Sequence, residues 1–372
     1  MRRRLIAGAC IGMLILSLGG CQRASVDYLA FRDTAVSADY SIDNRLTQAG
    51  FFAENLAIVG AEENQGEDEE LTSGASLLIN TTDNKVLYAD SVYDRLYPAS
   101  LTKLMTALVV LKYGELTDTV TVSYEASHIA ESGVKLCGFR EGDIIAMDAL
   151  LKCLLVYSGN DAAIAIADHI SGSEESFVKL MNEEAKKIGA VHTNYVNSSG
   201  LHDDNQYTTA YDVYLLFHEL MKYDTFRSII VMDSYTAVYQ DQAGNAKEKI
   251  FKATNSYLQG AASVPEGIQI IGGKTGTTRK AGNCLVLLSK NAGGKEFISV
   301  ILKASGSDVL YSQMSHLLTI VEADEADGEA AGDADSGSEE ETTGTAGEEA
   351  AETVGEAAAQ NSDEQSAGEA AE

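Results

Sequence analysis

Ser100 and Lys103 are the first residues in this sequence whose types and spacing suggest chemistry, because they lie three positions apart in the segment Ser-Leu-Thr-Lys. Pro98 just before them is accepted in the first turn of a helix, so we expect a helix that begins here and stops at Gly114. Side chains three positions apart share one helix face. A serine hydroxyl becomes a strong nucleophile when a base removes its proton, and an uncharged lysine is such a base. The pair therefore predicts a nucleophile, Ser100, and its general base, Lys103.

A second segment, Ser158-Gly159-Asn160, falls on a short polar turn between two apolar runs. A hydroxyl in such a turn relays a proton, and an amide binds a substrate carbonyl. The same three residue types also make ordinary turns. By itself this segment is weak support for a catalytic site.

The third segment is Lys274-Thr275-Gly276-Thr277, preceded by two glycines in an apolar strand pattern. Glycines inside a strand commonly mark a place where a ligand backbone approaches closely. The Lys274 cation and the hydroxyls of Thr275 and Thr277 suit a substrate carboxylate. A lysine base must be uncharged, and both burial and a nearby cation such as Lys274 lower the pKa of Lys103.

The three segments together, in this order, resemble the D-alanyl-D-alanine carboxypeptidases, which are low-molecular-mass penicillin-binding proteins. The resemblance covers residues 73–320, although residues 128–140 follow the family loosely. The matching segments are Tyr97-Pro98-Ala99-Ser100-Leu101-Thr102-Lys103, Ser158-Gly159-Asn160-Asp161-Ala162, Asn197-Ser198-Ser199-Gly200-Leu201 and Gly273-Lys274-Thr275-Gly276 followed by Ala281-Gly282.

The resemblance implies a set of catalytic roles. Ser100 would be acylated by the penultimate D-Ala carbonyl of a peptidoglycan stem peptide, after Lys103 takes its proton. Ser158 would pass a proton to the departing D-Ala. The backbone N–H groups of Ser100 and Thr277 would form the oxyanion hole, aimed at charge that develops in the transition state.

The same resemblance implies how substrates are held. Asn160 would hold the substrate amide, and Lys274 would orient the terminal carboxylate with help from Thr275 and Thr277. Penicillins mimic the D-Ala-D-Ala end and would acylate the same serine. No cofactor is implied.

The order of predicted elements indicates an α/β (α+β) domain, because strands stand at both ends and helices in the middle. Short runs joined by short turns favour an antiparallel sheet. The resemblance implies the serine β-lactamase/DD-peptidase-like fold, with an antiparallel five-stranded sheet covered by helices and a helical subdomain. The predicted strands span residues 75–80, 85–91, 267–277, 283–289 and 296–304.

The predicted helices occupy the middle of the domain and its end. Asp148 is expected to cap a helix over residues 149–156, and Thr209 starts a segment with the spacing of a capping box. The other expected helices span residues 161–170, 174–188 and 308–320.

The N-terminal residues have the pattern of an export signal. Three arginines precede an apolar stretch from residue 5 to 18, too short to span a bilayer comfortably. Leu18-Gly19-Gly20-Cys21 looks like a lipobox, at which Cys21 is lipidated. We therefore expect a lipoprotein-type signal peptide over residues 1–20, a polar tether over residues 21–70 and a catalytic domain over residues 71–320. The enzyme would be extracytoplasmic, anchored in the membrane by the lipid and facing the cell wall.

The C-terminal segment, residues 321–372, is expected to be a disordered acidic tail. It has 18 acidic residues after Val321 and no aromatic or basic residue, so it buries too little apolar surface to fold. The formal charge of the chain is −29. This charge excludes the basic surface that nucleic-acid binding needs.

Five cysteines show no paired spacing, so the sequence suggests neither a zinc site nor a disulfide framework. Cys153 and Cys284 lie in apolar runs typical of core residues. A Cys137–Cys153 bridge stays open as an alternative.

Other functions remain to be separated from the carboxypeptidase. A β-lactamase or a DD-endopeptidase would share the fold and motifs, and a penicillin-binding or wall-binding lipoprotein would keep them without turnover. A metallopeptidase is disfavoured, since His218-Glu219 lacks the second histidine of its motif and has Lys222 in that place.

Overall fold

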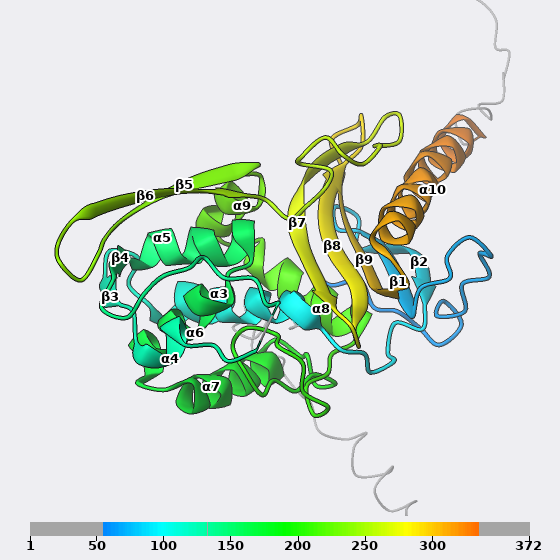
Figure 1. Cartoon of the computed structure of the whole chain (residues 1–372). Helices are drawn as coiled ribbons and strands as arrows, with labels where there is room; N and C mark the ends of the chain where they lie inside the picture. Colours follow the sequence, from blue (N-terminus) through cyan, green and yellow to red (C-terminus); the bar gives the residue numbers. More distant parts are fainter. Residues whose placement is uncertain (1–54, 132, 335–372) are drawn as a thin grey trace, which may run out of the picture. The chain divides into compact units, whose positions relative to one another are not determined.

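The computed structural model describes residues 55–131 and 133–334 (Figure 1). The compact unit begins at Val59. The predicted signal peptide, Cys21 and the end of the acidic tail lie outside the described residues. Among the helices of the described part, none is long and apolar enough to cross a membrane.

An antiparallel five-stranded sheet, ordered β2-β1-β9-β8-β7, forms the centre of the domain. Its first hairpin and its three C-terminal strands confirm the predicted elements to within a few residues. The inner strands are continuous apolar runs, as expected for strands covered on both faces. Their bounds are β1 Ala75–Asn80, β2 Lys85–Asp90, β7 Gln269–Thr278, β8 Gly282–Lys290 and β9 Glu296–Ala304.

Helices cover both faces of this sheet (Figure 1). α8 (Ala210–Leu220) packs on β9 and β1, and α10 (Ser307–Ala334) packs on β9, β2 and β8. Phe297 and Ile301 of β9 join Leu310 and Met314 of α10 in one buried cluster. Alternate side chains of a strand point to opposite faces, so the neighbouring residues of β9 face the other helix layer. The predicted α/β architecture is confirmed.

The middle of the chain forms the helical group, together with a small second sheet ordered β3-β4-β5-β6. Thr209 caps α8 through Asp212 N–H, as predicted. The elements are η2 Ala99–Leu101, α3 Thr102–Tyr113, β3 Thr119–Thr121, α4 Tyr124–Ser127, β4 Ile144–Ala146, α5 Met147–Lys152, η3 Cys153–Tyr157, α6 Asn160–Ser171, α7 Glu174–Lys187, α9 Asp224–Ile230, β5 Ser234–Gln240 and β6 Ala246–Lys252.

The structure corrects the expected start of α5. Ala146 is the N-cap, and Asp148 lies inside the first turn, where its carboxylate pairs with Lys152 at 2.5 Å. An acidic residue is favourable anywhere in the first helical turn, because it faces the positive end of the helix dipole. The sequence pattern therefore located the N-terminal region of this helix to within two residues and named the wrong residue as its cap.

The structure adds contacts and helix at the two ends of the expected catalytic domain. α10 continues to Ala334, so a helix end at Ile320 was wrong; alanine and glutamate, which are frequent there, have high helix propensity. Residues 59–70 pack on the domain instead of ending a free tether. Asp68 pairs with His316 of α10 at 2.8 Å, and Gln65 bridges to Asp90 of β2. These tertiary contacts were not predicted, because the high charge of residues 62–70 is typical of a solvated segment.

Candidate active site

The structure brings Ser100 and Lys103 together at the start of α3. Ser100 lies in the single turn η2, and the Lys103 Nζ is 3.1 Å from its Oγ. Ala99 just before it has a positive φ of 46°, a conformation that costs energy for an alanine and that occurs mainly at functional sites. Ser100 is thus held in a strained turn at the N-terminal end of α3.

Lys103 has no exposed surface, and its Nζ contacts three groups. It donates to Asn160 Oδ1 at 2.6 Å and to the Ser199 carbonyl oxygen. The third contact is the Ser100 Oγ. A neutral amine has two N–H groups and one lone pair, so the two acceptors leave the lone pair for the serine hydroxyl.

Burial lowers the pKa of Lys103 to about 7, with Cys137 and the Asp161 carboxylate acting in the opposite direction. A large fraction of Lys103 is therefore uncharged at neutral pH, as a general base requires. We expected the Lys274 cation to contribute to this lowered pKa. Burial is the main cause, and the repulsion between the two ammonium groups instead lowers the pKa of Lys274.

Ser158 follows a π-helical turn and has a left-handed backbone, with φ of 70°. This conformation turns its hydroxyl toward Lys274, whose Nζ donates to Ser158 Oγ at 2.9 Å and to the Thr275 carbonyl at 2.8 Å. Lys274 is only 1% exposed. Its pKa lies well below the usual range because of burial and the neighbouring Lys103 and Lys135 cations.

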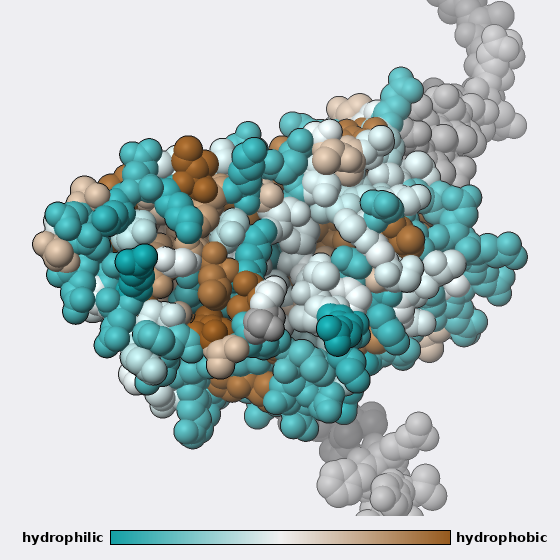
Figure 2. Space-filling view, viewed as in Figure 1, coloured by the Kyte–Doolittle hydropathy of each residue, from teal (hydrophilic) through white to brown (hydrophobic). Residues whose placement is uncertain are grey.

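Strand β7 forms the opposite side of the site. The side chains of Thr275 and Thr277 line the cleft, and their neighbour Lys274 points to the buried side. A Cβ on Gly276 would lie 3.1 Å from the Ser100 amide nitrogen, so the strand backbone passes directly beside the nucleophile. Figure 2 shows pale, weakly polar surface over this strand, in keeping with its threonines and glycines.

The two glycines before Lys274 have a different purpose from the one expected. A Cβ on Gly272 would lie 2.1 Å from the Ile230 carbonyl oxygen, and one on Gly273 would lie 2.1 Å from that of Val286. These glycines admit neighbouring protein backbone, so their interpretation as a ligand approach was wrong. Their lack of a side chain allows β7 to pack closely against α9 and β8.

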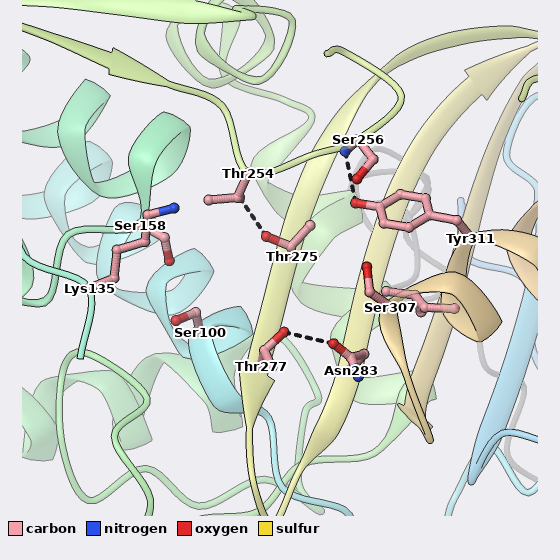
Figure 3. A pocket seen from close by; sticks show the side chains of 11 residues that line it. Ser100, Lys135, Ser158, Thr254, Ser256, Thr275, Thr277, Asn283, Ser307 and Tyr311 are labelled. Atoms are coloured by element: carbon pink, nitrogen blue, oxygen red, sulfur yellow. Dashed lines mark hydrogen bonds between the residues drawn. The ribbon is translucent and has the colours of Figure 1, made fainter. Parts of the chain in front are cut away.

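A cleft of about 260 Å³ opens between the helical group and β7 (Figure 3). Thr254 and Thr275 hydrogen-bond through their hydroxyls, and Thr277 Oγ1 donates to Asn283 Oδ1 at 3.1 Å. Lys103, Asn160 and Lys274 are nearly buried and contact the lining residues or their neighbours. The lining residues are Ser100, Lys135, Ser158, Thr254, Ser256, Thr275, Thr277, Asn283, Ser307, Leu310 and Tyr311.

Asp161 is a supporting residue for which the sequence analysis assigned no role. Its buried carboxylate accepts hydrogen bonds from the backbone N–H groups of Cys137, Gly138 and Phe139, at 2.8, 2.7 and 3.2 Å. It thereby fixes the rim of the site over which the family resemblance was loose. The sequence did carry a signal for this role, because Asp161 is a carboxylate in the first turn of an apolar helix, directly after Asn160.

The Asn197 loop is the second supporting element. The Asn197 side chain accepts from the Gly200 N–H at 2.7 Å and donates to the Leu201 carbonyl at 2.9 Å. Gly200 has φ of 86°, and a Cβ there would lie 1.9 Å from the Ala99 carbonyl oxygen, so only glycine fits. The loop presents the Ser199 carbonyl to Lys103. This segment was one of those that resemble the family, and no role had been expected for it.

The cysteines and histidines that the sequence offered as other candidates pack as structural residues. Cys137, Cys153 and Cys284 are buried free thiols, so the alternative of a Cys137–Cys153 bridge is not what the structure contains. His202 packs edge-on against Tyr97, and His218 packs against Tyr214. Within the described residues, no three His, Cys, Asp or Glu side chains gather as a metal site would require.

The structure thus brings together a serine and a lysine at a helix start, a Ser-x-Asn turn and a Lys-Thr-Gly strand. This arrangement is that of the DD-peptidase/penicillin-binding fold. The sequence matches the D-alanyl-D-alanine carboxypeptidase family over residues 61–306. The chain belongs to this family.

Individual relatives agree. The chain is 32% identical to the D-alanyl-D-alanine carboxypeptidase DacF of Bacillus subtilis, over 66% of this chain and 60% of that protein. It is 34% identical to DacC of Escherichia coli, over 70% of this chain and 63% of the relative. It therefore spans less than two thirds of the length of these relatives. The crystal structure of a Streptomyces DD-transpeptidase superposes with a TM-score of 0.63 at 27% identity, over 68% of this chain and 98% of that one.

Proposed function

We propose that this protein is a serine-type D-Ala-D-Ala carboxypeptidase that removes the terminal D-alanine from peptidoglycan stem peptides. One observation carries the proposal. The Lys103 Nζ has a lowered pKa of about 7 and gives both its N–H groups to fixed acceptors, which leaves its lone pair 3.1 Å from Ser100 Oγ. This geometry is that of a base ready to deprotonate a nucleophile.

In the acylation step, Lys103 takes the Ser100 proton as Oγ attacks the penultimate D-Ala carbonyl. The developing oxyanion is stabilised by the backbone N–H groups of Ser100 and Thr277, since β7 passes beside the nucleophile at Gly276. Ser158 then gives its proton to the departing amine. Lys274, which hydrogen-bonds Ser158, replaces that proton.

In the deacylation step, water attacks the acyl-enzyme and restores Ser100. Asn160 and the threonines of β7 hold the substrate backbone and its carboxylate. β-Lactams are proposed to acylate the same serine and to leave slowly. Rapid turnover of penicillin would instead indicate a β-lactamase.

The test compares the wild-type chain with Ser100→Ala and, as a matched control, with Ser312→Ala on the exposed surface of α10. A D-Ala-D-Ala peptide and a labelled penicillin are offered to each. We expect D-Ala release and covalent label from the wild type and the control. Both signals should fall by about 10⁴-fold or more in Ser100→Ala. Label without D-Ala release from the wild type would leave only a penicillin-binding protein.

The location of the enzyme is part of the same proposal. We propose that Cys21 is lipidated and holds the catalytic domain on the outer side of the membrane, facing the cell wall. The support is the sequence pattern around Leu18-Gly19-Gly20-Cys21. Incorporation of a labelled fatty acid by the wild type, and its loss in Cys21→Ser, checks this proposal.

A further inference from the structure

Lys135 is a cation in the cleft for which the sequence analysis gave no role. Within the part of the chain that the structure describes, it is the one charged side chain that lines the cleft. In Figure 3 its amine points into the cleft beside Ser158, across from Thr254 and Thr275. The other lining groups are hydroxyls, one amide and one leucine.

The Lys135 amine contacts an aromatic ring, and none of the carboxylates in the described residues is paired with it. Its Nζ lies 4.4 Å from the centroid of the Tyr157 ring. Partial burial lowers the pKa of Lys135, and Cys137 acts in the opposite direction. The aromatic face attracts a cation without neutralising it, so the amine remains able to pair with an incoming anion.

The backbone of Lys135 is fixed even though its side chain is partly exposed. Its carbonyl oxygen accepts a hydrogen bond from the Asn160 N–H at 2.9 Å. Two residues further on, the Cys137 N–H donates to Asp161 at 2.8 Å. The segment is therefore tied to the start of α6, beside the Ser158 turn, and the amine is held near the reacting groups.

Lys274 is a poor direct partner for a substrate carboxylate. It is not among the residues that line the cleft and is 1% exposed. Its ammonium already donates to Ser158 and to the Thr275 carbonyl. A carboxylate in the cleft reaches the hydroxyls of Thr254 and Thr275 and the Lys135 amine without displacing any of these bonds.

We propose that Lys135 pairs directly with the free terminal carboxylate of the substrate, together with the Thr254 and Thr275 hydroxyls. Lys274 then donates its hydrogen bond to the Ser158 hydroxyl from its buried position. The inference rests on the proposed function, because that function supplies the terminal carboxylate. It makes Lys135 a determinant of specificity for peptides with a free C-terminus.

The experiment measures binding separately from turnover. Peptides ending in D-Ala-D-Ala, with either a free carboxylate or a carboxamide terminus, are titrated into the Ser100→Ala chain and into the same chain carrying Lys135→Met, Lys135→Arg or Lys252→Met. Methionine keeps the unbranched shape of lysine, with one atom fewer, and lacks its charge. Lys252 is exposed on β6 and outside the cleft, so its variant controls for net charge.

We expect Lys135→Met to weaken binding of the free-acid peptide by about tenfold to a hundredfold, the usual range for a hydrogen bond to a charged group. Binding of the carboxamide should change little. Lys135→Arg should restore much of the preference for the free acid, and Lys252→Met should behave like the parent chain. In the chain with Ser100 intact, Lys135→Met should raise KM for the free acid more than it lowers kcat.

Three outcomes would overturn the inference: equal losses for acid and amide, no loss for either, or no measurable binding of the acid peptide by the parent chain. These outcomes are distinct from failure of the proposed function. If the wild type binds the acid peptide and releases no D-Ala, the proposed function fails, and the Lys135 comparison still decides the binding role.

Discussion

The two walls of the cleft are built on different physical principles. The helical wall carries Ser100 and Ser158, with Lys103 buried behind them and its nitrogen surrounded by fixed acceptors. The strand wall presents Thr275 and Thr277, which keep part of their surface exposed and share hydrogen bonds with other side chains. The first wall keeps Lys103 away from water. The second offers neutral hydroxyls to it.

This difference separates chemistry from recognition. A lysine becomes a base only when desolvation disfavours its charged form, and desolvation requires a closed, rigid surrounding. Substrate groups, in contrast, must exchange water for protein partners, which requires open hydroxyls and amides. Changes at Ser100, Lys103 and Ser158 should therefore reduce kcat strongly, and changes of the threonines on the strand wall should act mainly on KM.

The largest effect is expected at Lys103. Lys103→Met keeps the length of the side chain and removes the base, so kcat for D-Ala release should fall by about 10² to 10⁴-fold. The rate of acylation by penicillin, measured with a labelled drug, should fall with it. A matched change at the surface, Lys179→Met on α7, removes an exposed cation and should leave both rates unchanged. A Lys103→Met chain with wild-type acylation would break the comparison, because the helical wall would then not supply the base.

The next effect is expected at Asp161, which holds the rim. Asp161→Ala leaves the backbone N–H groups of Cys137, Gly138 and Phe139 without their acceptor, and each buried unsatisfied donor costs about 1–3 kcal/mol. We expect a loss of about 3 kcal/mol in the free energy of unfolding, measured in urea, together with a lower kcat.

Asp148→Ala is the control for this change, because it removes an exposed carboxylate paired only with Lys152 on α5. Its cost should stay below about 1 kcal/mol. Equal losses of stability in Asp161→Ala and Asp148→Ala would contradict a special role of Asp161 in holding the rim. Removal of the Asp161 charge should also lower the pKa of Lys103 further, since this carboxylate raises it.

The dependence of the rate on pH is expected to report Lys103. Its pKa is lowered to about 7 in the folded protein, and the uncharged form, which is the active one, predominates above that value. The acylation rate should therefore rise by about tenfold between pH 6 and pH 8. In Lys103→Met this rise should disappear. A rise that persists unchanged in the variant would assign the titration to another group.

Much of the site was predictable because its motifs are local. Ser100 and Lys103 share a helix start, and Ser158 and Asn160 share a turn, so spacing alone brings each pair together. Lys135 and Asp161 could not be predicted in the same way. Their roles depend on a loop whose shape is set by hydrogen bonds from residues 137–139 to a carboxylate more than twenty positions away.

In the fold too, elements with a clear local pattern were predicted and elements without one were not. The strands of the large sheet are apolar runs with clear turn signals, and their positions were predicted well. The β5–β6 hairpin was missed, because β6 (Ala246–Lys252) is charged and exposed along nearly its whole length and lacks the alternation of a half-buried strand. α10 was predicted too short, because acidic composition was taken as disorder where helix propensity also applies.

The smallest effect is expected at Thr275 on the strand wall. Thr275→Val keeps the shape and β-branching that suit a strand and removes only the hydroxyl that bonds Thr254. Loss of one neutral hydrogen bond costs about 1 kcal/mol, so KM for a D-Ala-D-Ala peptide should rise about fivefold while kcat stays within about twofold. The double variant with Thr254→Val measures how far the two hydrogen-bonded hydroxyls act as one unit, since residues in contact give non-additive losses. A fall in kcat with KM unchanged would show that Thr275 acts in the chemical step, and would contradict the proposed difference between the two walls.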